Sequence, residues 1–248
     1  MRWVSAAKMA KTRPDRSGIR FLRFARNDRK VCKIMNMLFK REMLRLYLVT
    51  DRPLALGRDL EWVVAEAVKG GVTLVQLREK EIDTREFIAL GRRLKALLAP
   101  LGVPLLINDR VDVALAVDAD GVHIGQSDMP YADARRLLGP DKIIGLSVEN
   151  EAEAAAVNAL DVDYIAVSPV YLTATKTDTA AAFGLEGVRR VAALTRHPMV
   201  GIGGMNAATA ADVIRAGADG VAVVSAIMSA PDPRAASAAL LALCKGAM

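Results

Sequence analysis

Cysteine and histidine are both scarce in this chain. Its 248 residues contain two of each, at Cys32, Cys244, His123 and His197. Two cysteines so far apart give neither a disulfide framework nor a Cys-x-x-Cys pair, which indicates a reducing compartment, most simply the cytoplasm. With no cysteine suited to act as a nucleophile, the sequence also lacks the usual machinery of covalent catalysis.

A long apolar run is missing as well, and the first 42 residues contain little acid. No stretch of 18 apolar residues occurs, so no membrane-spanning segment is expected. Residues 1–42 hold 13 Lys/Arg against 3 Asp/Glu, a net charge of +10, whereas residues 43–248 hold 21 against 25, a net charge of −4. The formal charge of +6 therefore comes from the tail, and the folded part is not expected to bind nucleic acid or membrane.

The role of residues 1–42 is open at this point. An Arg-rich, acid-poor segment is compatible with a basic arm for nucleic acid or membrane, or with a transit peptide. The simpler interpretation is an unordered extension, or a start codon assigned too early, with Met35, Met37 or Met43 as the true beginning. The segment lacks the apolar core of a signal peptide and has little serine, which favours the simpler interpretation. We expect removal of residues 1–42 to leave the activity and the melting temperature nearly unchanged.

From Leu44 onward, short β-branched runs alternate with stretches of helical periodicity, the pattern of βα units around a parallel sheet. An open doubly wound sheet is the alternative, but no GxGxxG motif follows the first strand. Residues 43–248 are therefore predicted to form a single α/β domain, a (β/α)8 TIM barrel. Its predicted strands are residues 44–50, 72–77, 104–107, 121–124, 143–147, 163–167, 198–202 and 219–224, and its predicted helices include residues 60–69, 84–98, 131–138, 149–160, 185–195, 206–216 and 233–243.

Short polar clusters follow the predicted strands. A parallel barrel puts all strand carboxyl ends on one face, so these clusters are expected to line one pocket. Arg78 and Lys80 stand at i and i+2 just past a strand, so both side chains leave the same face and suit a phosphate or diphosphate. Asp109 and Asp128 follow adjacent strands and are placed to share Mg²⁺, although either carboxylate alone is more often a helix N-cap.

A second anion site is predicted after the seventh strand. Gly201-Ile-Gly-Gly204 presents bare backbone N–H groups, and the usual phosphate site of such barrels follows strands seven and eight, where Gly204 and Ser225 fall. The alternative is that glycine merely relieves crowding at the rim. A diphosphate site and a separate monophosphate site imply two phosphorylated substrates.

Neither histidine is a strong candidate for a general base. His197 precedes Pro198 at the start of a strand, on the face of the barrel that serves stability. His123 alternates with apolar residues inside a strand, where a lone histidine is more often a satisfied interior residue. The sequence therefore predicts a site that stabilises a leaving group electrostatically, without acid–base or nucleophilic catalysis by side chains. The long connection of residues 168–183, with its single Lys176, is predicted to be a lid over this site.

These motifs together resemble the thiamine-phosphate synthase family, over residues 46 to about 230. The resemblance implies a transferase of thiamine biosynthesis that joins a pyrimidine diphosphate to a thiazole phosphate, uses Mg²⁺ and releases diphosphate. By matching position it implies that Asp109 and Asp128 bind Mg²⁺, and that Lys176, Arg78, Lys80 and Ser147 are catalytic. The implied ligands are Gln76, Leu77, Arg78, Glu79, Lys80, Asn108, Ser147 and Lys176 for the pyrimidine diphosphate, and Thr173, Ala174, Thr175, Gly204, Val224 and Ser225 for the thiazole phosphate side.

Two alternatives remain at this stage, a thiazole tautomerase-like enzyme and a non-catalytic paralogue that binds thiamine phosphate. The tautomerases place a histidine shortly after the fifth strand, where this chain reads Val148-Glu149-Asn150, and neither alternative needs both carboxylates of the metal pair. The chain departs from the family at Ser168-Pro169, where Gly-Pro is usual, and at Leu172, where proline is common. We expect these departures to affect the lid rather than the anion ligands. Self-association into a homo-oligomer is compatible with the sequence.

Overall fold

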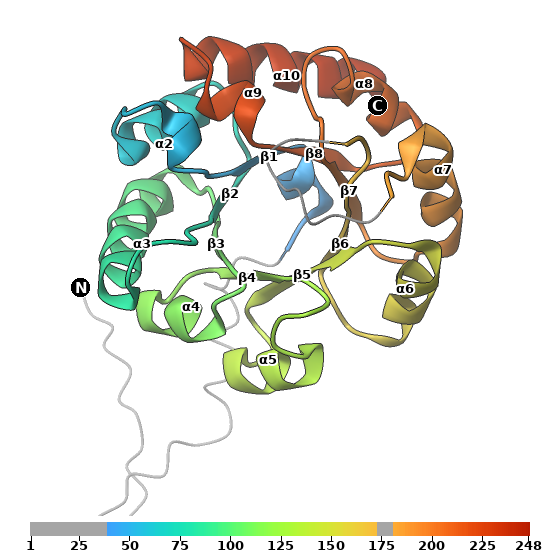
Figure 1. Ribbon diagram of the computed structural model, residues 1–248, viewed down its shortest axis with the longest axis horizontal. Helices are drawn as coiled ribbons and strands as arrows, with labels where there is room; N and C mark the ends of the chain where they lie inside the picture. The colour runs from blue at the N-terminus through green and yellow to red at the C-terminus, as the bar shows by residue number, and fades with distance from the viewer. Residues whose placement is uncertain (1–38, 173–180) are drawn as a thin grey trace, which may run out of the picture. The chain divides into compact units, whose positions relative to one another are not determined.

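The computed structural model describes residues 39–172 and 181–248. Eight parallel strands pair in sequence order, and β1 pairs with β8 to close the barrel, with Tyr47 beside Ala222. Figure 1 shows the strands as an inner ring with the helices outside it. The predicted TIM barrel is confirmed. Its strands are β1 (Leu46–Val49), β2 (Leu74–Leu77), β3 (Leu105–Asn108), β4 (Gly121–Ile124), β5 (Ile143–Val148), β6 (Tyr164–Val167), β7 (Met199–Ile202) and β8 (Gly220–Val223).

The outer helices begin where the sequence supplies caps. Asp59, Asp83, Asn150 and Asp232 each accept a hydrogen bond from a backbone N–H in the first turn of the helix that follows. None of the helices in the described part of the chain is both long and apolar enough to span a membrane. The helices are α2 (Leu60–Lys69), α3 (Thr84–Leu98), α4 (Val111–Val117), α5 (Tyr131–Leu138), α6 (Glu151–Ala156), α7 (Gly184–Leu194), α8 (Ala210–Arg215), α9 (Ser225–Met228) and α10 (Pro233–Ala247), with 3₁₀ turns at Arg41–Leu44, Pro53–Ala55, Ala99–Leu101 and Val157–Ala159.

The helix predicted from residue 206 begins four residues later. The Asn206 side chain accepts from the backbone N–H of Ala208 at 2.8 Å, which closes a local turn instead of a helical one. The Thr209 hydroxyl donates to the carbonyl oxygen of Gly204 at 2.9 Å and holds the chain in this turn until α8 starts at Ala210. Local side-chain bonding therefore overrides helical periodicity here.

Side chains alternate between the two faces of each strand. Leu46 and Leu48 face the helix layer, whereas Tyr47 and Val49 belong to the separate apolar cluster inside the barrel. The largest interior side chains are Tyr47 and Tyr164, and both are buried. A Cβ atom on Gly145 would lie 2.1 Å from Cζ of Tyr164, so only glycine leaves room for that ring.

A repeated polar contact ties the strands together at the amino ends of the barrel. The residue before each even-numbered strand accepts a hydrogen bond from a backbone N–H at the start of the preceding odd-numbered strand. The N–H donors and their acceptors are Leu46 to Thr73 Oγ1 at 3.0 Å, Leu105 to Asp120 Oδ2 at 2.8 Å, Ile144 to Asp163 Oδ2 at 2.8 Å, and Met199 to Asp219 Oδ2 at 2.8 Å.

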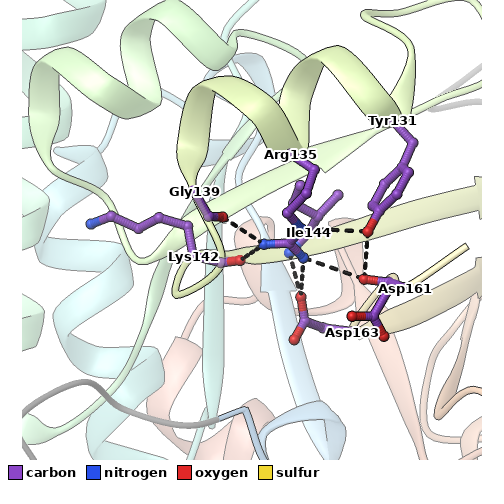
Figure 2. Close-up of polar contacts among 7 residues, drawn as sticks. All are labelled: Tyr131, Arg135, Gly139, Lys142, Ile144, Asp161 and Asp163. Carbon is purple, nitrogen blue, oxygen red and sulfur yellow. Dashed lines mark hydrogen bonds and ion pairs between the residues drawn. The ribbon is translucent and has the colours of Figure 1, made fainter. Parts of the chain in front are cut away.

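Each of the three aspartates in this set also has a basic partner. Asp120 pairs with Lys95 at 2.6 Å, Asp163 with Arg135 at 3.1 Å, and Asp219 with Arg41 at 3.0 Å. Figure 2 shows how the Arg135 guanidinium, held on α5, also donates to the carbonyl oxygens of Gly139 and Lys142, at 3.0 and 2.6 Å. Charge-assisted hydrogen bonds, and not packing alone, thus hold together the amino ends of the strands, which we call the floor of the barrel.

Residues just before the predicted start of the barrel at residue 43 contact it. Leu38–Met248 form one compact unit. The Phe39 ring stacks on Tyr164 inside the barrel, with ring centroids 5.8 Å apart and an interplanar angle of 16°. Figure 1 shows the segment around it, in blue, across the middle of the ring. We therefore propose that the barrel unit includes residues 39–42, and that removing residues 1–42 lowers the melting temperature instead of leaving it unchanged as the sequence suggested.

Two truncations test this boundary. A chain that starts at Met37 keeps Phe39 and is expected to melt like the full chain. A chain that starts at Met43 loses the buried part of that ring, about 1 to 2 kcal/mol of apolar burial, and is expected to melt roughly 2 to 6 °C lower. Calorimetry of both, with Phe39→Ala in the full chain as the control, measures the difference. Equal melting temperatures for the two truncated chains would contradict a role for Phe39.

Candidate active site

A cavity of about 410 Å³ opens at the carboxyl ends of the strands. All eight strands or the loops that follow them contribute residues to its lining, as the parallel topology requires. Ten of the sequence-predicted site residues line it, and they come from positions up to 149 residues apart in the chain. They are Gln76, Arg78, Lys80, Asn108, Asp109, Asp128, Ser147, Gly204, Val224 and Ser225.

Two predicted ligands have side chains outside this cavity. The chain stays extended past β2, so Gln76, Arg78 and Lys80 face inward while Leu77 and Glu79 face the other way. Leu77 is buried in the layer between strands and helices. Glu79 accepts from Nε of Arg52 at 3.2 Å. Neither Leu77 nor Glu79 is therefore among the residues that line the cavity.

Four further predicted residues, Thr173, Ala174, Thr175 and Lys176, lie outside the described residues. The start of the connection that carries them is tied to the loop after β7. The backbone N–H of Val170 donates to Ile202 at 2.8 Å, and that of Tyr171 donates to Gly203 at 3.2 Å. This pairing brings Val170 and Tyr171, at the start of the connection, to the rim beside Gly204.

The two aspartates predicted as metal ligands lie next to each other. Burial raises the pKa of Asp128 above its usual value, and the adjacent Asp109 carboxyl group raises it further. Asp128 also accepts from the backbone N–H of Gly125 at 2.7 Å, and Lys80 Nζ lies 2.7 Å from Asp109 Oδ2. Two neighbouring carboxylates with a lysine counter-charge fit a Mg²⁺ ion, which takes one or two protein carboxylates together with phosphate oxygens.

The backbone at Asp109 is left-handed, with φ of 60°. Aspartate tolerates this conformation better than most residues, yet it still costs free energy, of order 1 to 3 kcal/mol. The N–H of Asp109 donates to the carbonyl oxygen of His123 at 2.8 Å, and its own carbonyl accepts from Val111 at 3.1 Å. Hydrogen bonds to β4 and to the start of α4 thus hold Asp109 in a conformation that turns its carboxylate toward Asp128.

The glycine loop after β7 has the conformation that its sequence suggests. Gly203 and Gly204 have φ of 98° and 70°, where residues with a Cβ atom are strained. A Cβ atom on Gly204 would also lie 2.8 Å from Cβ of Tyr171. Glycine at 204 is therefore required both by the backbone and by the connection that packs on it.

The sequence did not reveal that polar side chains continue from the pocket into the barrel interior. Gln76 donates through Nε2 to the Tyr47 hydroxyl, which lies 2.9 Å from the Tyr164 hydroxyl. His123 lies 2.8 Å from that hydroxyl through Nδ1 and 2.9 Å from Ser147 Oγ through Nε2. His123 is a buried interior residue as expected, but it also lines the cavity. The one feature of the sequence that could have indicated this network is the alternation along β1 and β6, which turns Tyr47 and Tyr164 toward the barrel interior.

The other histidine has the structural role that was expected. His197 is buried, and its Nε2 donates to the carbonyl oxygen of Val157 at 3.2 Å. It is absent from the cavity lining.

Comparisons with known proteins agree on one family. The model of the family described as thiamine monophosphate synthase matches residues 46–227. A thiamine-phosphate synthase of Xanthobacter autotrophicus is 60% identical over 199 residues, covering 80% of this chain and 94% of the relative. One of Albidiferax ferrireducens is 58% identical over 192 residues, covering 77% and 88%. A solved thiamine phosphate pyrophosphorylase from Pyrococcus furiosus superposes with a TM-score of 0.77 at 39% identity, covering 84% and 98%.

Proposed function

The chain belongs to the thiamine monophosphate synthase family, and we propose that the cavity at the carboxyl ends of its strands is where its reaction takes place. The enzyme acts in thiamine biosynthesis. It condenses 4-amino-2-methyl-5-(diphosphooxymethyl)pyrimidine with thiazole phosphate and gives thiamine phosphate and diphosphate. Nothing in the comparisons favours the tautomerase or the non-catalytic paralogue.

One observation carries the assignment of the cavity. Two groups of residues lie on opposite sides of the same cavity. The first wall consists of charged side chains that follow β2 to β4, namely Arg78, Lys80, Asp109 and Asp128. The second wall is the glycine loop around Gly204, which follows β7. In a ring of eight strands, β3 and β7 are four strands apart and face each other. This arrangement suits two phosphorylated substrates whose reacting atoms meet between the walls.

The diphosphate end of the pyrimidine substrate is assigned to the first wall. Arg78 and Lys80 bind its oxygens, with Asn108 and Ser147 from the neighbouring strands and Lys176 from the connection outside the described residues. Asp109 and Asp128 would hold Mg²⁺, which when bound supplies positive charge that stabilises the departing diphosphate. The cations of this wall thus serve the bond that breaks, between the methylene carbon and the diphosphate oxygen.

The thiazole phosphate is assigned to the second wall. Backbone N–H groups around Gly204 and at Ser225 are the proposed phosphate donors, with Thr173 and Thr175 from the connection. The neutral thiazole nitrogen attacks the methylene carbon with its lone pair and has no proton to lose. The reaction therefore needs no general base, which agrees with the structural setting of both histidines.

The remaining assignments concern the surroundings of the enzyme. We propose the cytoplasm as its location, a reducing compartment that fits a chain without a disulfide framework. No nucleic-acid or membrane partner is part of the proposal.

The direct test is to mix the purified chain with both substrates and Mg²⁺ and to follow thiamine phosphate and diphosphate. We expect the two products in equal amounts, none when either substrate is omitted, and loss of turnover in excess EDTA with recovery on adding Mg²⁺. Absence of product under all conditions would contradict the proposed function. Unchanged turnover in EDTA would contradict the metal role alone.

Asp128→Asn tests the metal pair more locally. The substitution keeps the size of the side chain but removes one charge beside Asp109, so we expect turnover to fall about 100-fold or more, several kcal/mol in the barrier. Asp133→Asn on α5 is the matched control, because Asp133 is exposed and outside the cavity. Similar turnover in the two variants would show that Asp128 has no part in binding the metal.

Gly204→Val tests the second wall. We expect the dissociation constant for thiazole phosphate to rise about tenfold or more, roughly 1.4 kcal/mol, with little change for the pyrimidine diphosphate. Gly102→Val is the matched control, because Gly102 has a similar φ of 66° and open space around it, precedes the amino end of β3 and is not among the residues that line the cavity. Isothermal titration of folded variants gives both constants, and an equal affinity of Gly204→Val and wild type would place the second phosphate elsewhere.

A further inference from the structure

The hydrogen-bonded chain inside the barrel ends at the pocket. Its five side chains are Gln76, Tyr47, Tyr164, His123 and Ser147, from β2, β1, β6, β4 and β5. Tyr164 is the one member that is absent from the cavity lining. Any effect of its hydroxyl group on a bound substrate therefore passes through its neighbours.

Packing holds the Tyr164 ring from several sides. Phe39 stacks on it, the His123 ring lies 5.6 Å away at 25°, and the Tyr47 ring meets it edge-on at 6.0 Å and 82°. Gly145 leaves the space that the ring fills. The position of the hydroxyl oxygen is thus set by the barrel interior, independently of any substrate.

The donors and acceptors of the chain can be ordered from one end. The Gln76 amide nitrogen only donates, so the Tyr47 oxygen accepts from it. Burial raises the pKa of both phenols, so each keeps its single proton at neutral pH. If Tyr47 donates to Tyr164, and Tyr164 donates to Nδ1 of His123, each phenol accepts one bond and donates one. The reverse order would leave the Tyr47 proton needing another acceptor.

We propose that Tyr164 is a positioning residue, which donates to Nδ1 of His123 and so holds the neutral imidazole with its proton on Nε2. His123 then donates to Ser147 Oγ, and the Ser147 hydroxyl proton is directed at an acceptor atom of the pyrimidine diphosphate. The role of Ser147 toward the substrate rests on the proposed function. The tautomer of His123 follows from the hydrogen-bond order alone and is independent of the proposed function.

Tyr164→Phe tests the proposal, because it removes the hydroxyl and keeps the ring. We expect kcat/KM for the pyrimidine diphosphate to fall about tenfold, the loss of roughly one hydrogen bond, while KM for thiazole phosphate stays within about twofold. Tyr131→Phe is the matched control. Its hydroxyl also donates a hydrogen bond, to the carbonyl oxygen of Asp161 at 2.8 Å, but it lies on α5 and outside the cavity. This variant should leave both parameters unchanged.

A spectroscopic readout separates positioning from a merely structural role. The chain has two histidines, so ¹⁵N-histidine labelling gives two imidazoles, and a His197→Asn variant assigns them. At pH 8 the wild-type His123 should show a protonated Nε2 and an unprotonated Nδ1. In Tyr164→Phe its nitrogen shifts should move toward a mixture of tautomers, whereas those of His197 should stay in place.

A double substitution tests whether the effect passes through Ser147. If it does, Tyr164→Phe combined with Ser147→Ala should be no slower than Ser147→Ala alone. Additive losses in the double variant, or a wild-type His123 with its proton on Nδ1, would overturn the proposal. A wild-type chain that makes no thiamine phosphate would refute the proposed function, and the tautomer measurement would then decide the hydrogen-bond order by itself.

Discussion

Closure of the sheet between β1 and β8 is the constraint on which every functional position depends. Parallel closure brings the carboxyl ends of all eight strands to one rim, and the two-residue alternation of each strand decides which side chains enter the pocket. Arg78 and Lys80 enter it, whereas Leu77 and Glu79, their immediate neighbours, do not. A shift of β2 by one residue would exchange these sets and replace two cations with a leucine and a carboxylate.

The amino ends of the strands provide the rigidity that this geometry needs. Buried or half-buried carboxylates are costly unless they are paired, and Asp120, Asp163 and Asp219 each have a basic partner as well as a backbone donor. These contacts recur before alternate strands, so they hold neighbouring strands in register around the ring. The floor thus maintains the register, and the register positions the site residues.

Features that depend on neighbouring residues could be predicted from the sequence, and features that depend on distant ones could not. The strands and the inward direction of Arg78 and Lys80 follow from apolar runs and an i, i+2 spacing. The family resemblance named every residue from Gln76 to Lys80 as a ligand, including Leu77 and Glu79. The alternation of side chains along the strand predicts that these two face away from the pocket. The contact of His123 with Tyr164 joins residues 41 positions apart in the chain. The contact of Phe39 with the same ring joins the barrel to a residue that the charge distribution assigns to the basic segment of residues 1–42. Strand alternation turns Tyr164 into the barrel, but no local pattern indicates that His123 and Phe39 are its partners there.

Lys80 connects the two charged groups of the first wall. Its ammonium group lies 2.7 Å from Asp109, and the pKa of Asp128 is raised first by burial and then by the adjacent Asp109 carboxyl group, with Lys80 opposing the rise. A diphosphate that draws Lys80 away would leave Asp109 and Asp128 facing each other with less compensation still. Under the proposed function, a second cation beside the carboxylates would then restore the charge that Lys80 no longer supplies. On that proposal the paired aspartates would link the binding of the anionic substrate to that of a divalent cation, because each would balance charge that the other leaves uncompensated.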